Sequence, residues 1–373
     1  MKPGKATRSQ LRRHNRQLIL RHVFTGAATS RSALAQETDL TKPAVSDLVE
    51  SLIADGLLVE EGFGASTESG GKRPRLLRFI RDARQVIGIS INQSAVIGML
   101  TNLDGEVIAE HAAVLPATDP EIAFATTVMV INGLIAQLHA PLLCIGVGIS
   151  AIVDAQGVIV SAPCYSWEDF ALGERLRMHF GVPVSVANST ELAALAQFTF
   201  GSVSGSLATV MISSSVGVGV VFAGGAYHLG SEVGFLADGG QTPLHDRLGW
   251  NSVLAKAQAL DLLHPQRLDL TYAYIRFAAE QGNAAAIRLC DELARELAPL
   301  FAWVIALLRP DTLALAGLIS DLGGSFLQQT VEYTRAHVLP ALVDRTLFVI
   351  DDTPNLTALG AAARAIQLEL GLL

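Results

Sequence analysis

The sequence has few cysteines, with only three in 373 residues. Cys144, Cys164 and Cys290 lie far apart, and no two cysteines have the CxxC spacing. This pattern excludes a disulfide-held scaffold and a cysteine-rich metal knuckle, because both need several cysteines at short spacings. We expect three reduced thiols in a cytoplasmic protein.

Long apolar runs are also missing. No stretch reaches the roughly 18 uninterrupted apolar residues of a membrane-spanning helix. The basic start, MKPGKATRSQLRRHNRQ, lacks the apolar centre of a secretion signal. We therefore expect a chain that is neither exported nor membrane-spanning. Its 373 residues, 50% of them hydrophobic, are enough for two or three packed units.

Basic residues are scarce after residue 85 of a chain whose net charge is -8. Residues 1–85 carry 15 Lys and Arg against 9 Asp and Glu, whereas the rest carries 12 against 26. The basic part suits a polyanion such as DNA, because neutralising phosphates releases counterions. The acidic part would be repelled by DNA, so two parts with different partners are predicted.

Within the basic part, the apolar spacing predicts three helices with short turns. The first ends at Gly26, and the second begins at Ser30 or Ser32. The third has Thr41 as its N-cap and Pro43 in its first turn. An apolar stripe of helical period follows, made of Val45, Leu48, Val49, Leu52 and Ile53. After it, LLVEEGF can pair with RPRLLRFI as a hairpin around GASTESGGK.

Three helices and a hairpin in this order are typical of a winged helix-turn-helix, whose third helix enters the major groove. Arginines on the wing would reach the minor groove or the backbone. The alternative is a solvated charged loop over a small helical domain. The predicted DNA-binding residues are Thr41, Lys42, Pro43, Ser46, Asp47, Lys72, Arg73 and Arg75.

From Val86 the pattern changes to short apolar strands that alternate with helices. VIGISINQSAVIGMLTNLDGEVIAEHAAVL predicts a meander of three strands, which a helix and further strands follow. A similar order restarts at LATVMISSSVGVGVVFAGG. Two rounds of strands and helices predict two α/β lobes around a cleft.

Several segments resemble the ROK family, which contains sugar kinases and sugar-responsive repressors. They are LTKPAVSDLVESLIADGLLVEEG, GGKRPRLLRF, VIGISINQSAVIGMLTNLDGEVI, GVPVSVANSTELAALAQ, VGVGVVFAGGAYHLGSEVGF and NLTALGAAARA. The resemblance implies a winged helix-turn-helix over residues 1–82 and a two-lobed α/β domain of the actin-like ATPase fold over 83–373. One lobe would contain 83–185 and the C-terminal helix, and the other 186–355.

The chain departs from the kinases of this family at the catalytic base. Kinase members have an Asn-Asp pair, in which the Asp takes the proton from the sugar hydroxyl, and this chain has Asn188 and Ser189. Loss of a general base costs about 10²–10⁴ in rate. Glu191 is expected to point elsewhere, so no catalytic residue is predicted.

The nucleotide-binding segments are altered as well. The family's DxGGT is replaced by residues 90–94, SINQS, without the carboxylate or the glycines. Gly217, Gly219, Gly224 and Gly225 remain in the second loop, where a tight hairpin explains them, and Gly317 remains at the adenosine end. We expect no ATP and no other cofactor.

The family's zinc motif is absent from the sequence. Members usually have ExGH followed by CxCGxxGC, which binds zinc through one His and three thiolates. Here Phe235 replaces the His, and SEVGFLADGGQTPLHDRLGWNS has no cysteine. We expect no metal at this position.

Part of the family's sugar site remains. Glu232 matches the Glu of ExGH and Asn188 the retained Asn, and the resemblance gives Ser189, Trp167 and Asn251 possible contacts as well. A carboxylate and an amide suit ring hydroxyls. The alternatives are a loop acid for Glu232 and a helix cap for Asn188.

Two functional classes follow from these residues. The first is a repressor that binds a palindromic DNA operator as a homodimer or homotetramer and responds to a carbohydrate or a derivative of one. The second is a sugar kinase with a fused DNA-binding domain. A regulator whose larger domain has lost its ligand and serves only for oligomerisation is a third possibility.

Overall fold

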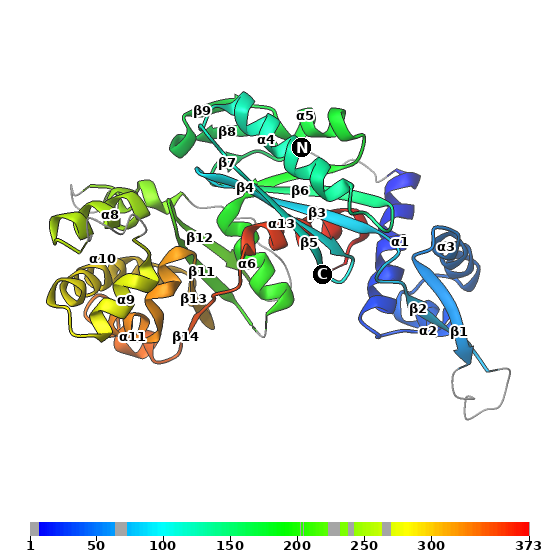
Figure 1. The fold of residues 1–373 in the computed structure, drawn as a ribbon. Helices are drawn as coiled ribbons and strands as arrows, with labels where there is room; N and C mark the ends of the chain where they lie inside the picture. Colours follow the sequence, from blue (N-terminus) through cyan, green and yellow to red (C-terminus); the bar gives the residue numbers. More distant parts are fainter. Residues whose placement is uncertain are drawn as a thin grey trace.

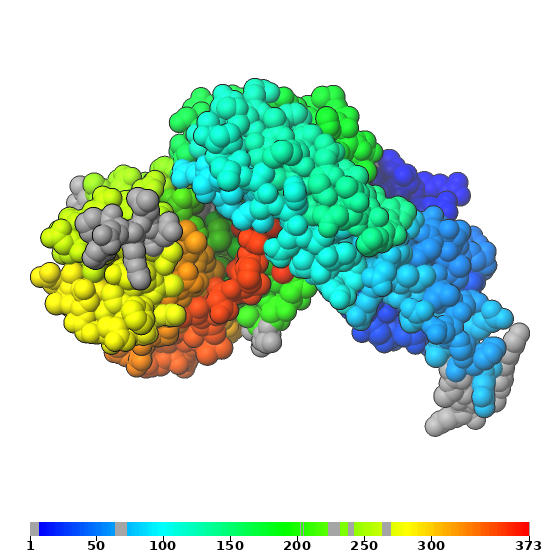
Figure 2. Space-filling view, in the orientation of Figure 1, coloured from blue at the N-terminus to red at the C-terminus, as the bar shows by residue number. Residues whose placement is uncertain are grey.

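The computed structural model describes residues 7–63, 73–201, 203, 205–222, 232–237, 242–262 and 270–372 (Figure 1). A winged-helix unit lies at one end of the molecule and the second α/β lobe at the other, with the first lobe between them (Figure 2). Among the described residues, no helix is long and apolar enough to cross a membrane.

The N-terminal unit has the predicted order of elements. Thr7, Ser30 and Thr41 cap its three helices by accepting hydrogen bonds from backbone N–H groups. Ile19, Leu20 and Val23 of the first helix are buried, whereas Leu11 is 52% exposed. The elements are α1 (Arg8–Phe24), α2 (Arg31–Glu37), α3 (Lys42–Ala54), β1 (Leu58–Phe63) and β2 (Arg75–Phe79), with β1 antiparallel to β2.

The first lobe contains a five-stranded sheet in the order β10-β6-β3-β4-β5. The expected meander forms β3 (Gln85–Ile91), β4 (Ala95–Asn102) and β5 (Val107–Val114). The other strands are β6 (Leu142–Ile149) and β10 (Val184–Asn188), which are parallel. Around this sheet lie α4 (Pro120–Ile135), β7 (Ile152–Val153), β8 (Ile159–Ala162), η1 (Pro163–Tyr165), β9 (Trp167–Phe170) and α5 (Leu172–Phe180).

The two domain limits expected from the sequence can be compared with the bounds of these strands. The limit at residue 82 falls between β2 and β3. The limit between the lobes, expected after residue 185, falls inside β10, which continues to Asn188 opposite Ile149 of β6. The first sheet therefore extends three residues beyond that expectation, because the backbone stays paired until α6 begins.

The second lobe has a four-stranded sheet in the order β12-β11-β13-β14, with helices around it. The strands are β11 (Leu207–Ile212), β12 (Val216–Val221), β13 (Thr312–Ala316) and β14 (Leu347–Ile350). The helices are α6 (Ser189–Phe200), η2 (Val233–Phe235), α7 (Leu244–Leu248), α8 (Trp250–Ala259), α9 (Tyr272–Glu280), α10 (Ala284–Leu308), η3 (Leu318–Leu322), α11 (Gly323–Thr334) and α12 (Pro340–Val343).

Gly217 and Gly219 lie inside β12, and not in the hairpin turn where the sequence places them. A Cβ added at Gly219 would lie 2.1 Å from the carbonyl oxygen of Thr190 in α6. These glycines therefore allow the helix to lie directly on the strand. Gly224 and Gly225 are outside the described residues.

The last helix, α13 (Leu356–Leu370), lies between the first sheet and α6 (Figure 1). Its Gly360 packs so closely on α6 that an added Cβ would lie 1.8 Å from the carbonyl oxygen of Leu192. The other end of α13 contacts α1, where Arg13 Nη2 donates to Leu368 O at 2.8 Å. Ile366 and Leu370 share one apolar cluster with Ile19 of α1. The winged helix and the larger domain thus have a common core.

Candidate functional site

The predicted groove-contacting residues gather at the start of α3. Thr41, Lys42, Pro43 and Asp47 are exposed there, opposite the buried stripe of the same helix. Ser46 is half-buried, and its carbonyl oxygen accepts a hydrogen bond from Arg31. The exposed face is polar, as a helix that enters a groove requires.

Of the three predicted wing residues, the structure describes Arg73 and Arg75. Lys72 is outside the described residues, and Arg73 stands just before β2. Arg75, in β2, donates to Glu60 Oε2 at 2.9 Å, and Arg31 lies 3.1 Å from the other oxygen of Glu60. The hydrogen bond from Arg75 holds the pKa of Glu60 below its usual value. Glu60 therefore partly neutralises the charge that Arg75 brings to this surface.

In the larger domain, the structure brings Asn188 and Glu232 together. Asn188 ends β10, and its Nδ2 donates to Glu232 Oε1 at 2.9 Å and to Ala151 O at 3.0 Å. Its Oδ1 accepts from the backbone N–H and the hydroxyl of Thr190, both at 2.9 Å, and so caps α6. Asn188 is a helix cap and a partner of Glu232 at once, and both of its side-chain donors are used.

Glu232 is partly buried, and this burial raises the pKa of its carboxyl group, while the hydrogen bond from Asn188 opposes that rise. Asn188 contacts only Oε1 of the carboxyl group. Among the described residues, none donates a hydrogen bond to Oε2, so that oxygen can accept one from a ligand hydroxyl.

Ser189 begins α6 and is 7% exposed. Its backbone carbonyl accepts from Thr357 at 3.2 Å, but its hydroxyl has no hydrogen-bond partner among the described residues. Glu191, two residues further, lies 3.1 Å from Arg364 of α13, and these side chains are 11% and 17% exposed. Glu191 is thus paired within the fold, in agreement with its expected orientation away from the position of a base.

The structure buries Trp167 in the core, whereas a ligand contact of Asn251 stays a prediction. Trp167 is 2% exposed, its indole N–H donates to the carbonyl oxygen of Thr118, and its ring packs on Tyr165. Asn251 is exposed on α8. The sequence resemblance placed Trp167 near the cleft, but the aromatic side chain of this segment that reaches the cleft is Tyr165, two residues earlier.

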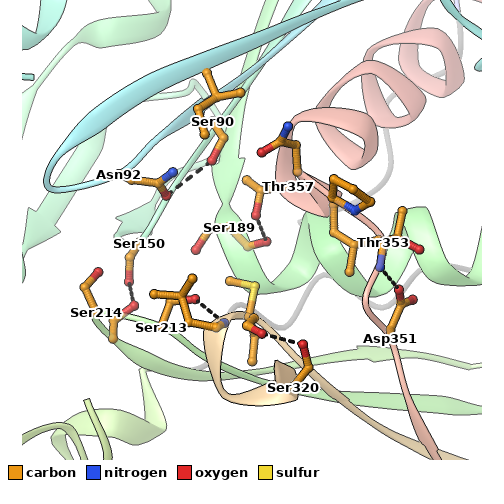
Figure 3. Close-up of a pocket in the computed structure, with 18 of the residues that line it drawn as sticks. Ser90, Asn92, Ser150, Ser189, Ser213, Ser214, Ser320, Asp351, Thr353 and Thr357 are labelled. Carbon is orange, nitrogen blue, oxygen red and sulfur yellow. Dashed lines mark hydrogen bonds between the residues drawn. The ribbon is translucent and has the colours of Figure 1, made fainter. Parts of the chain in front are cut away.

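A cavity of about 300 Å³ lies between the two lobes next to Ser189 (Figure 3). Its walls carry many hydroxyl groups and three carboxylates, and no Lys, Arg or His is among the described residues that line it. The polar side chains are Ser90, Asn92, Ser150, Tyr165, Ser189, Ser213, Ser214, Ser215, Ser320, Asp321, Asp351, Asp352, Thr353, Asn355 and Thr357.

Sequence reasoning missed most of these residues. It treats the serines at 213–215 only as the start of the second phosphate loop, although a run of three serines is itself a polar signal. Gly317 also lines the cavity, with a φ of +85°. A Cβ there would lie 2.5 Å from Ile212 O, so close backbone packing explains this glycine without a nucleotide.

The segment of the family's zinc motif contains Phe235, whose ring stacks on His245 with centroids 5.7 Å apart. In the part of the chain that the structure describes, no three His, Cys, Asp or Glu side chains form a group that could hold a metal ion.

Several proteins with similar sequences are named as repressors. The xylose repressor of Bacillus subtilis (strain 168) is 29% identical over 221 residues, which are 58% of this chain and 57% of that protein. This chain therefore matches little more than half the length of that relative. A putative xylose repressor of Caldicellulosiruptor sp. (strain Rt8B.4) is 25% identical over 354 residues, which are 87% of this chain and 88% of that one.

Solved structures show the same fold. A ROK family transcriptional regulator described as a homologue of the E. coli MLC protein has a TM-score of 0.82 at 20% identity, with 96% of both chains covered. A ROK family glucokinase from Streptomyces griseus, in complex with glucose and AMPPNP, has a TM-score of 0.66 at 19% identity and covers 76% of this chain and 99% of its own. Residues 86–367 match the model of the ROK family, and this chain therefore belongs to the ROK family.

Proposed function

We propose that the protein is a DNA-binding transcriptional regulator, a repressor of carbohydrate-related genes that a small sugar-like ligand controls. The observation that carries the proposal is the path through α13. Leu356 and Thr357 at its start line the inter-lobe cavity, and Ile366 and Leu370 near its end share a core with α1. A ligand that favours one lobe arrangement can shift the winged helix through this helix, with a coupling of about 1–3 kcal/mol.

The DNA-binding part of the proposal is supported by the basic charge of residues 1–85 and by the exposed start of α3. Fluorescence anisotropy with the DNA upstream of the protein's own gene, and with a scrambled duplex, tests it. We expect a salt-sensitive preference for the upstream DNA, which Lys42→Ala weakens. Arg345→Ala, an exposed charge on the second lobe, is the matched control. Equal binding to both duplexes would reject DNA-sequence recognition.

We further propose that the larger domain is not a kinase. Ser189 stands where kinases of the family have a general base, and Glu191 is paired with Arg364. The cavity walls also lack a described cation for phosphate groups. A coupled ATP-consumption assay with hexoses and pentoses is expected to show no turnover above the rate without protein. Sugar-dependent ADP release would instead support the kinase alternative.

The ligand site is proposed around Glu232. Its removal should cost about 1.5–3 kcal/mol of ligand binding, the range of hydrogen bonds to charged groups. Thermal shift with D-xylose and D-glucose compares the native protein with Glu232→Ala, and the exposed Glu168→Ala is the control. The site is supported if a sugar stabilises the native protein and Glu168→Ala but does not stabilise Glu232→Ala. If no sugar shifts any of the three proteins, the ligand-free oligomerisation domain becomes the better account.

The oligomeric state is proposed as a homodimer or homotetramer, because a palindromic operator has the symmetry of an even-numbered assembly. Light scattering of the purified protein, with and without operator DNA, tests this. A monomer under both conditions would exclude it.

A further inference from the structure

The inter-lobe cavity lies next to the residues that hold Glu232. Ser150 and Ser189 line the cavity, and their chain neighbours are Ala151 and Asn188. Asn188 is hydrogen-bonded to Ala151 O and to Glu232. Tyr165 also lines the cavity, and the negative charge of Glu232 is one of the causes, after burial and Cys164, that raise the pKa of this phenol. A ligand held by Glu232 would therefore lie close to this cavity.

The walls of this space are suited to sugar hydroxyls. Serines from both lobes face it: Ser90 and Ser150 from the first, and Ser213 and Ser320 from the second (Figure 3). A hydroxyl both donates and accepts, which matches the hydrogen bonding of a saccharide. Some of these groups are partly satisfied within the protein, since Ser150 Oγ donates to Ser215 Oγ at 3.1 Å.

Ser189 gives an independent indication of a ligand. Its residue is 7% exposed, its side chain points into the cavity, and its hydroxyl has no hydrogen-bond partner among the described residues (Figure 3). Because this hydroxyl faces the cavity, it is available to a ligand or to water there.

The charge of the walls limits the chemistry of that ligand. Asp321, Asp351 and Asp352 line one side, and the described lining residues include no cation. A phosphate in the cavity would meet carboxylates and no described cation, so its binding is disfavoured. A neutral saccharide or one with an amine would not be repelled by these carboxylates.

We propose that this cavity is a second saccharide subsite, so that the ligand is an uncharged or amine-bearing saccharide of at least two rings. One ring lies at Glu232 and the next among the serines and aspartates. The cavity has a volume of about 300 Å³, which is at the lower end of the range for ordinary ligand pockets. The position of the first ring at Glu232 is not counted in this volume. This inference rests on the proposed ligand-binding function and specifies its ligand class.

Isothermal titration with matched probes tests it: D-xylose against xylobiose, D-glucose against cellobiose and maltose, and D-glucose against D-glucosamine and glucose 6-phosphate. We expect at least one disaccharide to bind about tenfold or more tightly than its monosaccharide. Glucose 6-phosphate should bind more weakly than glucose, whereas glucosamine should bind at least as well.

Thr353→Trp tests the location of the second ring. Thr353 is exposed and lines the cavity, so a tryptophan fills the space without disturbing a core. We expect this variant to remove the advantage of the disaccharide and to leave monosaccharide binding unchanged. Leu339→Trp, at a position 72% exposed on the second lobe, is the control and should change neither.

The outcomes separate this inference from the function on which it rests. If monosaccharides bind through Glu232 but disaccharides bind no better, and Thr353→Trp has no effect, the second subsite is wrong and the proposed function stands. Tighter binding of the phosphate would also overturn the subsite. If no saccharide binds the native protein, both the subsite and the sugar-controlled function fail.

Discussion

Asn188 Nδ2 lies 2.9 Å from Glu232 Oε1, and the same side chain caps α6 through its oxygen. The amide thus joins the last residue of the first sheet, the first turn of α6 and the acid of the proposed ligand site. Because its two donors are already used by Ala151 and Glu232, we propose that Asn188 serves the ligand site by orienting Glu232.

Replacement of Asn188 should affect stability and ligand binding together. Asn188→Ala removes a helix cap and the partner of a partly buried carboxylate, and we expect a loss of about 2 kcal/mol in the free energy of unfolding. Asn188→Asp keeps the cap acceptor but places a second carboxylate beside Glu232, so it should lose sugar binding with a smaller loss of stability. Urea unfolding and thermal shift check both. An unchanged urea midpoint for Asn188→Ala would contradict the capping role.

Glu232 should make stability and ligand binding depend on pH in opposite directions. Burial raises its pKa in the folded state above the ordinary value of 4.5. Between 4.5 and the raised pKa the folded protein holds more protons than the unfolded chain, so this residue lowers stability as pH rises through that window. Sugar binding needs the carboxylate and should instead be gained as pH rises through the folded pKa.

Urea unfolding and sugar titration between about pH 4 and pH 8 measure both trends. Glu232→Gln has no titrating group at this position and is the reference. Identical pH profiles for the two proteins would show that the carboxyl group has no raised pKa.

The ion pair between Glu191 and Arg364 should stabilise the contact of α6 with α13. Both side chains are largely buried, so removing one leaves the other charge without its partner. Glu191→Ala is expected to lower the free energy of unfolding by about 3 kcal/mol. Asp344→Ala breaks the exposed pair with Arg335 and should cost less than about 1 kcal/mol. Comparable losses in the two variants would argue against this role for the buried pair.

Gly360 is required for the close approach of α13 to α6. Gly360→Ala places a Cβ 1.8 Å from the Leu192 carbonyl oxygen, so one helix must move, at a cost of about 3 kcal/mol. Gly324→Ala in α11 meets no atom within 4 Å and should be neutral or stabilising by about 0.5–1 kcal/mol. Calorimetric unfolding compares the two, and a neutral Gly360→Ala would show that α13 is not held against α6.

DNA binding should depend more on Lys42 than on Arg75. Removing a cation that neutralises one phosphate reduces the slope of log affinity against log salt by about 0.9. Lys42→Ala should show a change of that size, whereas Arg75→Ala should show less because Glu60 already pairs with this arginine. Glu60→Gln should steepen the slope. Anisotropy titrations at several salt concentrations measure all three, and an effect of Arg75→Ala as large as that of Lys42→Ala would contradict this account.

Several features could be predicted because they depend on neighbours in the sequence. The cap at Thr41, the stripe from Val45 to Leu52 and the meander of β3, β4 and β5 are local periodicities, and each forms as predicted. Asn188 and Glu232 were assigned to one site only through the resemblance to a family, because the residues are far apart in the chain, and their hydrogen bond was not predicted.

Other features could not be predicted from local patterns. Trp167 lies in the core and Tyr165 at the cavity, because the packing of β9 decides which aromatic side chain turns inward. Gly217 and Gly219 lie in a strand under α6, although a hairpin turn would be sufficient to explain them from the sequence. Each depends on an element distant in sequence that supplies the opposing surface.

The sequence by itself determined the helices and hairpin of the N-terminal unit and the two-lobed α/β order, because periodicity is a local property. The tertiary structure alone decided how the serines of both lobes and the three aspartates form one cavity. It also decided that α13 runs from that cavity to α1. Such contacts arise when segments hundreds of residues apart bury a common apolar surface, and no local pattern carries that information.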